Sequence, residues 1–498
     1  MKRITKHLMT LLLSVVMVLA MGLIVFAEGK TYSLTLTETA TNHTYEVYQI
    51  FTGDLSAKED GTKVLSNVQW GKGVSYSGEG TASEVATKLS APENDSNRMT
   101  LDQLLNKLTL TKPVKTVTSA KDSTVIDGLS AGYYLVKDKD GSQANTSDAY
   151  TKFIVQVVGD TTSQVKSDVP TVVKKVKDTN DSQGTTSDWQ DSADADINDD
   201  VQYRITGTMP STIGDYTTYK YVFTDTMSKG LTYTDNNAKI TIGDKDVTSS
   251  FNETVTTKED GSTVVTWTCD DLKGINGVTL TEDTTVVVTY SAKLNEKAII
   301  GAAGNPNTVD LTYSNNPNNG GEGDTGKTPE DKNIVFTYKT VVNKVDQDKK
   351  SLKGASFKLE KKLSDGSYKT VKEFTAGEET KFEFSGLDDG EYKLTETTTP
   401  AGYNTIAPIG FTISAEHDAD SADPKLISLS GNVTSGEAKF TADKDAGSLT
   451  TDVVNKKGST LPSTGGRGTT MIYIIGAALV VLAGVVLVMR KKMSSKES

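Results

Sequence analysis

Hydrophobic residues are arranged differently at the two ends of the chain and in its middle. Two uninterrupted apolar stretches, about Leu8–Phe26 and Met471–Met489, lie at the ends. Between them, short runs such as Val264–Cys269 and Thr285–Tyr290 alternate apolar and polar residues. Alternation with period two is typical of strands that bury one face, and turn signals such as Asp389-Gly390 separate the runs. The pattern predicts a mainly β body between two apolar segments.

The first part of this body differs from the rest, because two helix-like stretches, Ser83–Leu89 and Met99–Leu108, interrupt its strands. We therefore expect a mixed α+β N-terminal domain followed by tandem immunoglobulin-like β-sandwiches, the fold that many short strands with turns favour. A strand opened by Pro170 and a polar segment at 314–333 mark the boundaries. The expected domains are 28–168, 169–325 and 333–457, with a linker at 326–332.

Both ends have the features of targeting segments. Lys2, Arg3 and Lys6 precede the first apolar stretch, and Val25-Phe26-Ala27 offers small residues at the cleavage positions. These features predict a secretory signal peptide over 1–27, with an uncleaved anchor as the alternative. The second stretch, 471–489, is uncharged and long enough to cross a membrane as a helix. Its cationic tail, 490–498, is expected to stay on the cytoplasmic side.

Composition narrows the possible chemistry of the body. A net charge of −12 without a basic patch argues against nucleic acid as a partner. The single cysteine, Cys269, excludes a disulfide framework and is interpreted as a core thiol. Three histidines leave little room for a metal site or a Ser-His-Asp triad. We expect no metal and no cofactor, and the acidic segment Asp188–Asp200 is interpreted as a solvated loop rather than a cation site.

The pentapeptide Leu461-Pro462-Ser463-Thr464-Gly465 lies just before the second apolar stretch. With that stretch and the cationic tail, it resembles the LPXTG cell-wall sorting signal of Gram-positive surface proteins. Pro462 disfavours helix for its neighbour and so keeps the motif extended and accessible. The resemblance implies that a sortase cleaves between Thr464 and Gly465 and passes the Thr464 acyl group to an amine. The alternative is a single-pass membrane protein in which the pentapeptide is incidental.

In the last domain, the segment Tyr392–Tyr403 resembles the E-box of Cna-B-type domains in Gram-positive adhesins and pilins. In that family a lysine of the first strand and an asparagine of the last strand join as an isopeptide, promoted by the E-box glutamate. The resemblance therefore implies that Lys344 is the nucleophile, Glu396 the acid/base and Asn455 the electrophile. Burial keeps such an amine neutral and such a carboxyl protonated, as the reaction requires. A buried salt bridge or solvated surface charges are the alternatives.

The middle domain has a second candidate set. Its segment 224–231 resembles the acid-bearing segment of backbone-pilin middle domains, which makes Asp225 the acid, and 311–317 resembles their closing strand. Period-two alternation then chooses between neighbours. It places Lys174 toward the core if the flanking valines are buried, and Asn315 if Leu311 and Tyr313 are buried. A shift of one residue would give these roles to Lys175 and Asn316.

Taken together, the mixed first domain, two candidate isopeptide domains and sorting signal resemble backbone (major) pilins of Gram-positive sortase-assembled pili. The resemblance implies a structural subunit that a class C pilin sortase polymerises head to tail and a housekeeping sortase attaches to peptidoglycan. Minor tip and base pilins are its other implied partners. The best match to the linking lysine is Lys166, although the family's Tyr-Pro-Lys motif is replaced by Gln164-Val165-Lys166. Lys174 and Lys175 are competing candidates for the linking lysine. The alternative for Lys166 is a solvated lysine of the linker with no role in polymerisation.

Two other functions fit the same sequence features. A monomeric wall-anchored adhesin would share both end signals and both sets of isopeptide-forming residues, which we call clamp residues. It would need no reactive linker lysine. A minor basal or tip pilin would need a longer proline-rich stalk or an extra binding domain, and the chain has only 11 prolines. An independent enzyme is not expected, because the only intrinsic chemistry implied is a single isopeptide-forming event in each domain. The sequence does not indicate a host ligand.

Overall fold

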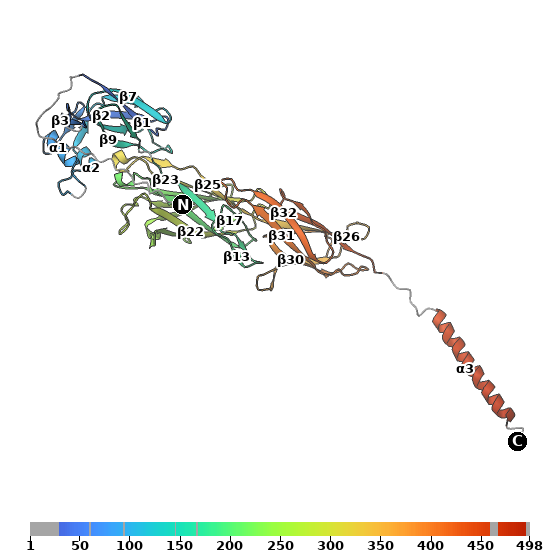
Figure 1. Ribbon diagram of the computed structural model, residues 1–498. Coiled ribbons are helices and arrows are strands. Elements are labelled where there is room, and N and C mark those ends of the chain that lie inside the picture. Colours follow the sequence, from blue (N-terminus) through green and yellow to red (C-terminus); the bar gives the residue numbers. More distant parts are fainter. Residues whose placement is uncertain are drawn as a thin grey trace.

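The computed structural model describes residues 29–58, 61–92, 95–144, 146–165, 168–458 and 467–494. Figure 1 shows three β-rich domains that follow one another along an elongated body. Residues Arg467–Ser494 form helix α3, and Met471–Lys492 is the one helical segment of the described residues that is long and apolar enough to span a membrane. The predicted fold class, mainly β with a mixed N-terminal domain, is confirmed.

The first domain has a sheet of order β3-β2-β8-β9, with β6 also paired to β2, and a smaller sheet β10-β1-β7. Helix α1 (Ala82–Leu89) begins at a capping box made by Thr81 and Glu84, and α2 (Leu101–Leu105) follows it. The strands are β1 (Tyr32–Thr37), β2 (Thr44–Ala57), β3 (Lys63–Trp70), β4 (Val74–Tyr76), β5 (Leu108–Leu110), β6 (Lys115–Thr118), β7 (Ser123–Leu129), β8 (Gly132–Asp138), β9 (Lys152–Val157) and β10 (Thr161–Gln164).

The middle domain packs a sheet of order β11-β15-β22-β18-β19 against one of order β14-β25-β23-β16-β21-β20. Its short 3-10 turns are Ile213–Asp215, Thr248–Ser250 and Pro317–Asn319. The strands are β11 (Val172–Val176), β12 (Thr179–Asn180), β13 (Thr185–Thr186), β14 (Ser192–Asp194), β15 (Asp200–Thr208), β16 (Tyr221–Met227), β17 (Leu231–Tyr233), β18 (Lys239–Ile242), β19 (Lys245–Asp246), β20 (Asn252–Thr257), β21 (Thr263–Cys269), β22 (Thr285–Leu294), β23 (Asn305–Ser314), β24 (Thr325–Lys327) and β25 (Asp331–Phe336).

The third domain is also a sandwich of two sheets, of order β29-β26-β34-β33 and β28-β27-β30-β31-β32. Its core is rich in phenylalanine, with Phe357, Phe382 and Phe384 fully buried. The strands are β26 (Tyr338–Asp346), β27 (Ser356–Lys362), β28 (Tyr368–Phe374), β29 (Lys381–Leu387), β30 (Gly390–Thr398), β31 (Ile409–His417), β32 (Leu426–Ser435), β33 (Thr441–Asp443) and β34 (Ser448–Asn455).

The linker expected at 326–332 is not a linker in the structure. Strand β24 pairs with β23, and Asp331–Val335 of β25 pairs with the other end of the same strand. A polar, glycine-rich segment has the same main-chain N–H and C=O groups as any other. It can therefore pair with the edge of β23 that β16 leaves open, which needs hydrogen-bond partners. The segment is therefore part of the middle sheet, and β25 leads directly into the core of the third domain through Phe336.

The acidic segment 188–200 is not a solvated loop either. Asp191, Asp194 and Asp196 are buried, because this segment packs against the third domain. Strand β14 pairs in parallel with β25, and Asp196 accepts a hydrogen bond from the backbone N–H of Asp388. The density of charge along the sequence does not reveal such burial, because the burial depends on contacts with the neighbouring domain. Cys269, by contrast, is a buried free thiol, as expected.

Candidate functional site

The third domain brings Lys344, Glu396 and Asn455 together in its core. Strands β26 and β34 are parallel neighbours, with Lys344 opposite Val453 and Asn455 two residues further along. Both side chains are 0% exposed. Lys344 Nζ lies 3.3 Å from Glu396 Oε1, and Asn455 Nδ2 donates to Glu396 Oε2 at 2.9 Å. The glutamate of β30 in the facing sheet thus touches the lysine with one oxygen and the asparagine with the other.

The surroundings of Lys344 favour a reactive amine. Burial lowers its pKa, and the nearby Glu396 carboxylate only partly opposes that effect. Its Nζ also donates to the Val453 carbonyl at 3.2 Å and lies 5.9 Å from the centre of the Phe357 ring. Asn455 Nδ2 makes a second hydrogen bond, to the Asn404 carbonyl at 2.9 Å, while its Oδ1 has no partner among the described residues. The carboxamide oxygen is therefore free to accept a hydrogen bond.

The middle domain contains a comparable cluster around Lys174. Lys174 and Asp225 are 0% exposed and form an ion pair through Nζ and Oδ2. Tyr290 of β22 completes the cluster, because Lys174 Nζ donates to its hydroxyl at 2.6 Å and that hydroxyl donates to Asp225 Oδ2 at 3.0 Å. Burial lowers the pKa of Lys174 and raises the pKa of Asp225. Both shifts favour the neutral amine and the protonated acid.

The asparagine in this cluster is Asn307 and not the expected Asn315. Asn307 Nδ2 donates to the Tyr290 hydroxyl at 2.9 Å, and its Oδ1 has no partner among the described residues. Asn315 is also buried, but its Nδ2 donates to the Gln143 and Asp148 carbonyls of the first domain, both at 2.9 Å. The prediction found the correct face of β23 but the wrong end, because Lys174 lies level with the start of that strand.

Backbone contacts show how β11, which carries Lys174, is offset along β23. Lys174 N donates to Asp331 Oδ2 at 2.6 Å, and Asp331 pairs with Val309 in the sheet. The far end of β23 instead reaches the first domain, where Tyr313 Oη donates to the Ser147 carbonyl. Sequence alternation could have listed Asn307 as well, since it shares its face with Asn315, but alternation alone does not choose between them.

The alternative residues of the middle domain lie outside the cluster. Lys175 points away from the core and pairs with Asp191 at 2.6 Å, and Asn316 donates to Asp324 Oδ2 at 2.9 Å. Sequence reasoning did not find Tyr290, which a strand pattern presents only as another aromatic core residue. The linking candidate Lys166 and the sorting motif Leu461–Gly465 lie outside the described residues.

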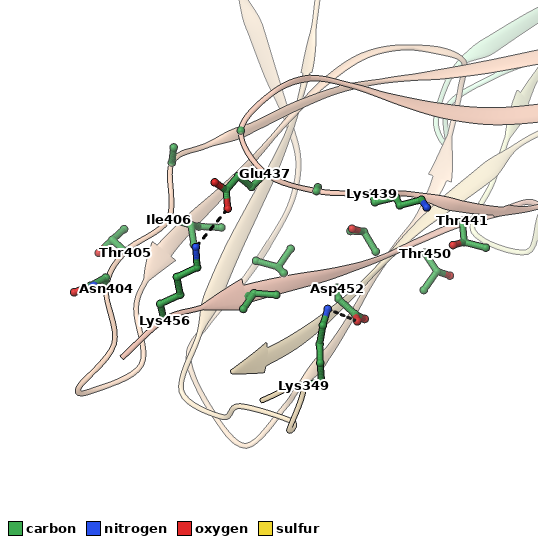
Figure 2. Close-up of a pocket in the computed structure, with 16 residues that line it drawn as sticks. Lys349, Asn404, Thr405, Ile406, Glu437, Lys439, Thr441, Thr450, Asp452 and Lys456 are labelled. Atoms are coloured by element: carbon green, nitrogen blue, oxygen red, sulfur yellow. Dashed lines mark hydrogen bonds and ion pairs between the residues drawn. The ribbon is translucent and has the colours of Figure 1, made fainter. Parts of the chain in front are cut away.

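A groove of about 710 Å³ runs beside β34 and is separate from the clamp residues (Figure 2). Four of its charged residues form pairs, Lys349 with Asp452 at 3.4 Å and Lys456 with Glu437 at 3.9 Å. It is lined by residues from both faces of β34, but Lys344, Glu396 and Asn455 are not among them. Asn404 and Val453 line the groove and reach the buried cluster only through their backbone carbonyls, which accept from Asn455 and Lys344.

Three family models match parts of the chain. The Gram-positive pilin backbone subunit 2, Cna-B-like domain matches residues 197–317, the SpaA prealbumin-like fold domain matches 339–424, and the LPXTG cell wall anchor motif matches 453–496. The first two cover the body of the middle domain and most of the third, and the last includes the end of β34, the pentapeptide and α3.

One related sequence and two solved structures are also similar to the chain. The trypsin-resistant surface T6 protein of Streptococcus pyogenes serotype M6 is 27% identical over 399 residues, 66% of this chain and 70% of that protein. The solved three-domain structure of the T6 backbone pilin aligns with a TM-score of 0.52 at 19% identity, over 87% of this chain and all of that one. The major pilin SpaD of Corynebacterium diphtheriae aligns with a TM-score of 0.49 at 19% identity, over 86% of this chain and 98% of that one.

Proposed function

We propose that this chain, a cell-wall-anchored structural pilus subunit of the Gram-positive backbone type, forms the shaft of a covalent pilus. In this proposal a pilin sortase joins Thr464 of one subunit to Lys166 of the next, and a housekeeping sortase attaches the finished polymer to peptidoglycan. Two internal isopeptides, Lys344–Asn455 and Lys174–Asn307, strengthen each subunit. The observation that carries the clamps is the contact of one buried acid with both the lysine and the asparagine in the third domain.

The proposed reaction is an amide exchange in each core. The neutral lysine Nζ attacks the asparagine Cγ while the protonated acid donates a hydrogen bond to the carboxamide oxygen. The C–N bond to the original amide nitrogen then breaks, and that nitrogen leaves as ammonia with a proton relayed by the acid. No oxidant or cofactor is needed, and each domain reacts once. The protein is therefore a structural protein and not a turnover enzyme.

Such clamps would suit an exported chain that has only one cysteine. Each joins the first strand of a domain to a strand late in that domain, β23 or β34, across loops of about 130 and about 110 residues. A cross-link over such a loop stabilises by on the order of 5 kcal/mol in the chain-entropy treatment of disulfides. Under tension, force would pass through the cross-link and bypass most of each sandwich. This mechanical role is what a pilus shaft requires.

Intact mass spectrometry of residues 28–460 tests the clamps. Because each bond releases one ammonia, we expect the wild type to be about 34 Da lighter than its sequence mass. Glu396→Ala, Asp225→Ala and Asn307→Ala should each keep only one deficit of about 17 Da relative to their own sequence masses. Asn315→Ala is the matched control for Asn307 and should keep both deficits. An unshifted wild-type mass would contradict the clamps and leave two plain sandwich domains.

Cells that express the full chain together with a pilin sortase test the polymerisation. We expect a ladder of high-mass surface polymers, which Lys166→Ala and deletion of residues 461–465 should both abolish. Lys152→Ala is a suitable control, because Lys152 belongs to the same domain and its Nζ donates to the Pro317 carbonyl. A ladder that survives Lys166→Ala would assign the link to another lysine. A lack of any ladder with the sortase present would favour the monomeric adhesin.

A further inference from the structure

Carboxylates gather at the junction between the middle and third domains. Seven of them lie there: Asp178, Asp181, Asp194, Asp196, Asp199, Asp388 and Asp389. The basic side chains that face them are Lys361 and His417, together with Lys369 near Asp199. The junction therefore has more negative than positive charge, and part of it is buried. This imbalance is what a bound cation could relieve.

One half of the cluster is already neutralised by protein groups. Lys361 is fully buried and donates to Asp196 Oδ2 at 2.8 Å and to Asp388 Oδ2 at 2.9 Å. His417 Nε2 lies 3.2 Å from Asp178 Oδ2, and its Nδ1 lies 2.7 Å from Ser192 Oγ. These contacts leave Asp194 without a basic partner within hydrogen-bonding distance among the described residues.

Asp388, whose Oδ2 already accepts from Lys361, also belongs to a second group of carboxylates that has the geometry of a cation site. One carboxylate oxygen from each of Asp194, Asp388 and Asp389 lies within 4.8 Å of the other two. A second observation points to a ligand: Asp194 is only 3% exposed, and its Oδ2 has no hydrogen-bond partner among the described residues. A buried carboxylate oxygen without a partner is costly unless another positive group satisfies it.

We propose that a divalent cation of the calcium class binds between the domains at Asp194, Asp388 and Asp389. Three carboxylates are the hard oxygen ligands that Ca²⁺ prefers, and water can complete its shell of six to eight oxygens. Asp194 ends strand β14 of the middle domain, whereas Asp388 and Asp389 form the turn before β30 of the third. The ion therefore bonds the two domains to each other.

This site would act where the proposed isopeptides do not. Both clamps lie within single domains, so neither proposed isopeptide crosses the junction. A cation that joins Asp194 to Asp388 and Asp389 stiffens that junction.

Calorimetric titration of chelator-treated residues 28–460 with CaCl₂ tests the proposal. We expect saturable binding of one ion at millimolar or lower concentration, and a higher thermal midpoint in CaCl₂ than in chelator. Asp194→Asn should abolish both effects. Asp199→Asn is the matched control, since Asp199 belongs to the Lys361 side of the cluster and should leave binding intact. Absence of binding at 10 mM CaCl₂, or its survival in Asp194→Asn, would overturn the proposal.

A second measurement keeps the proposal testable if Asp194→Asn folds poorly. Tyr338 lies beside Asp194, so excitation of tyrosine should sensitise the luminescence of Tb³⁺ bound at this site in the wild type. We expect Ca²⁺ to displace the Tb³⁺, and Tyr338→Phe to reduce the signal without reducing Ca²⁺ binding. Binding of Zn²⁺ but not Ca²⁺, with loss in His417→Ala, would overturn the calcium site in favour of the set Asp178, Asp194 and His417.

Discussion

Among the described residues, three lysines are 0% exposed, and their surroundings divide them into two kinds. Lys174 and Lys344 each contact a single acid inside a sandwich core, and burial lowers the pKa of both. Lys361 lies at the junction between domains with two carboxylates within 2.9 Å, and these raise its pKa despite burial. Burial alone therefore does not make a lysine reactive. The number of negative charges around it decides whether the amine is a nucleophile or a permanent cation.

The largest effect is expected when the acid of the third-domain clamp is removed. Glu396→Ala should prevent the Lys344–Asn455 bond and lower the free energy of unfolding of that domain by on the order of 5 kcal/mol. Urea unfolding with mass analysis of each sample measures this loss. Glu391→Ala is the control, because Glu391 lies on the same strand and pairs only at the surface with Lys362 at 2.8 Å. A stable, fully cross-linked Glu396→Ala protein would show that Glu396 is not the promoter.

Removal of the positive charge of Lys361 at the junction between the middle and third domains should produce the next largest effect. Lys361→Met leaves Asp196 and Asp388 buried without their partner, so we expect a loss of about 3–5 kcal/mol in the stability of the junction. The mass deficit from both isopeptides should remain unchanged, because Lys361 takes part in neither. Lys362→Met, at a half-exposed neighbour, should cost less than about 1 kcal/mol. A changed mass deficit in Lys361→Met would mean that Lys361 affects isopeptide formation. It would contradict the division of the buried lysines into reactive amines and permanent cations.

A smaller effect, on the rate of isopeptide formation, is expected when Tyr290 is changed. This tyrosine is the residue by which the middle-domain cluster differs from the third-domain cluster. Tyr290→Phe removes the hydroxyl that contacts Lys174, Asp225 and Asn307. Bond formation in the middle domain should slow by on the order of 10²-fold, as for loss of a group that positions or relays a proton. Mass spectra taken at intervals after refolding would show it. Tyr221→Phe should react at the wild-type rate, because its hydroxyl donates to the Thr208 carbonyl and not to the cluster.

The smallest effect concerns the first domain, whose buried ion pair contains histidine instead of lysine. His43 Nδ1 lies 3.0 Å from Asp138 Oδ1, and both groups are 0% exposed. The pKa of His43 is raised above 6.5 by Asp138 and Asp148, although burial opposes this, and burial raises the pKa of Asp138. The folded domain therefore binds protons more tightly than the unfolded chain does.

The sign of the pH dependence follows from those directions. The contribution of His43 is fully present below pH 6.5 and is lost as the pH rises through its raised folded pKa. The raised pKa of Asp138 acts in the same direction. We expect hydrogen exchange in β2 and β8 to be faster at pH 8 than at pH 6 after correction for intrinsic rates, and His43→Gln to weaken this difference. Slower corrected exchange at pH 8 would contradict the assignment.

Much of the candidate chemistry follows from local sequence. The period-two pattern assigned the strands, and it placed Lys174 rather than Lys175 toward the core because side chains alternate across a strand whatever surrounds it. The third-domain residues Lys344, Glu396 and Asn455 were instead implied by the resemblance of Tyr392–Tyr403 to the E-box of a known family. Each lies in a recognisable segment at a strand end, and the structure brings the three together as expected.

Only the tertiary structure decided how distant segments align. The choice of Asn307 over Asn315 depends on the stagger between β11 and β23, and both residues satisfy the same alternation. The incorporation of 326–332 into the middle sheet and the burial of Asp194 likewise depend on partners supplied by other segments. Sequence patterns report which face a residue occupies, because that is a property of one strand. Which residue it meets across the core is a property of two strands, and packing alone sets it.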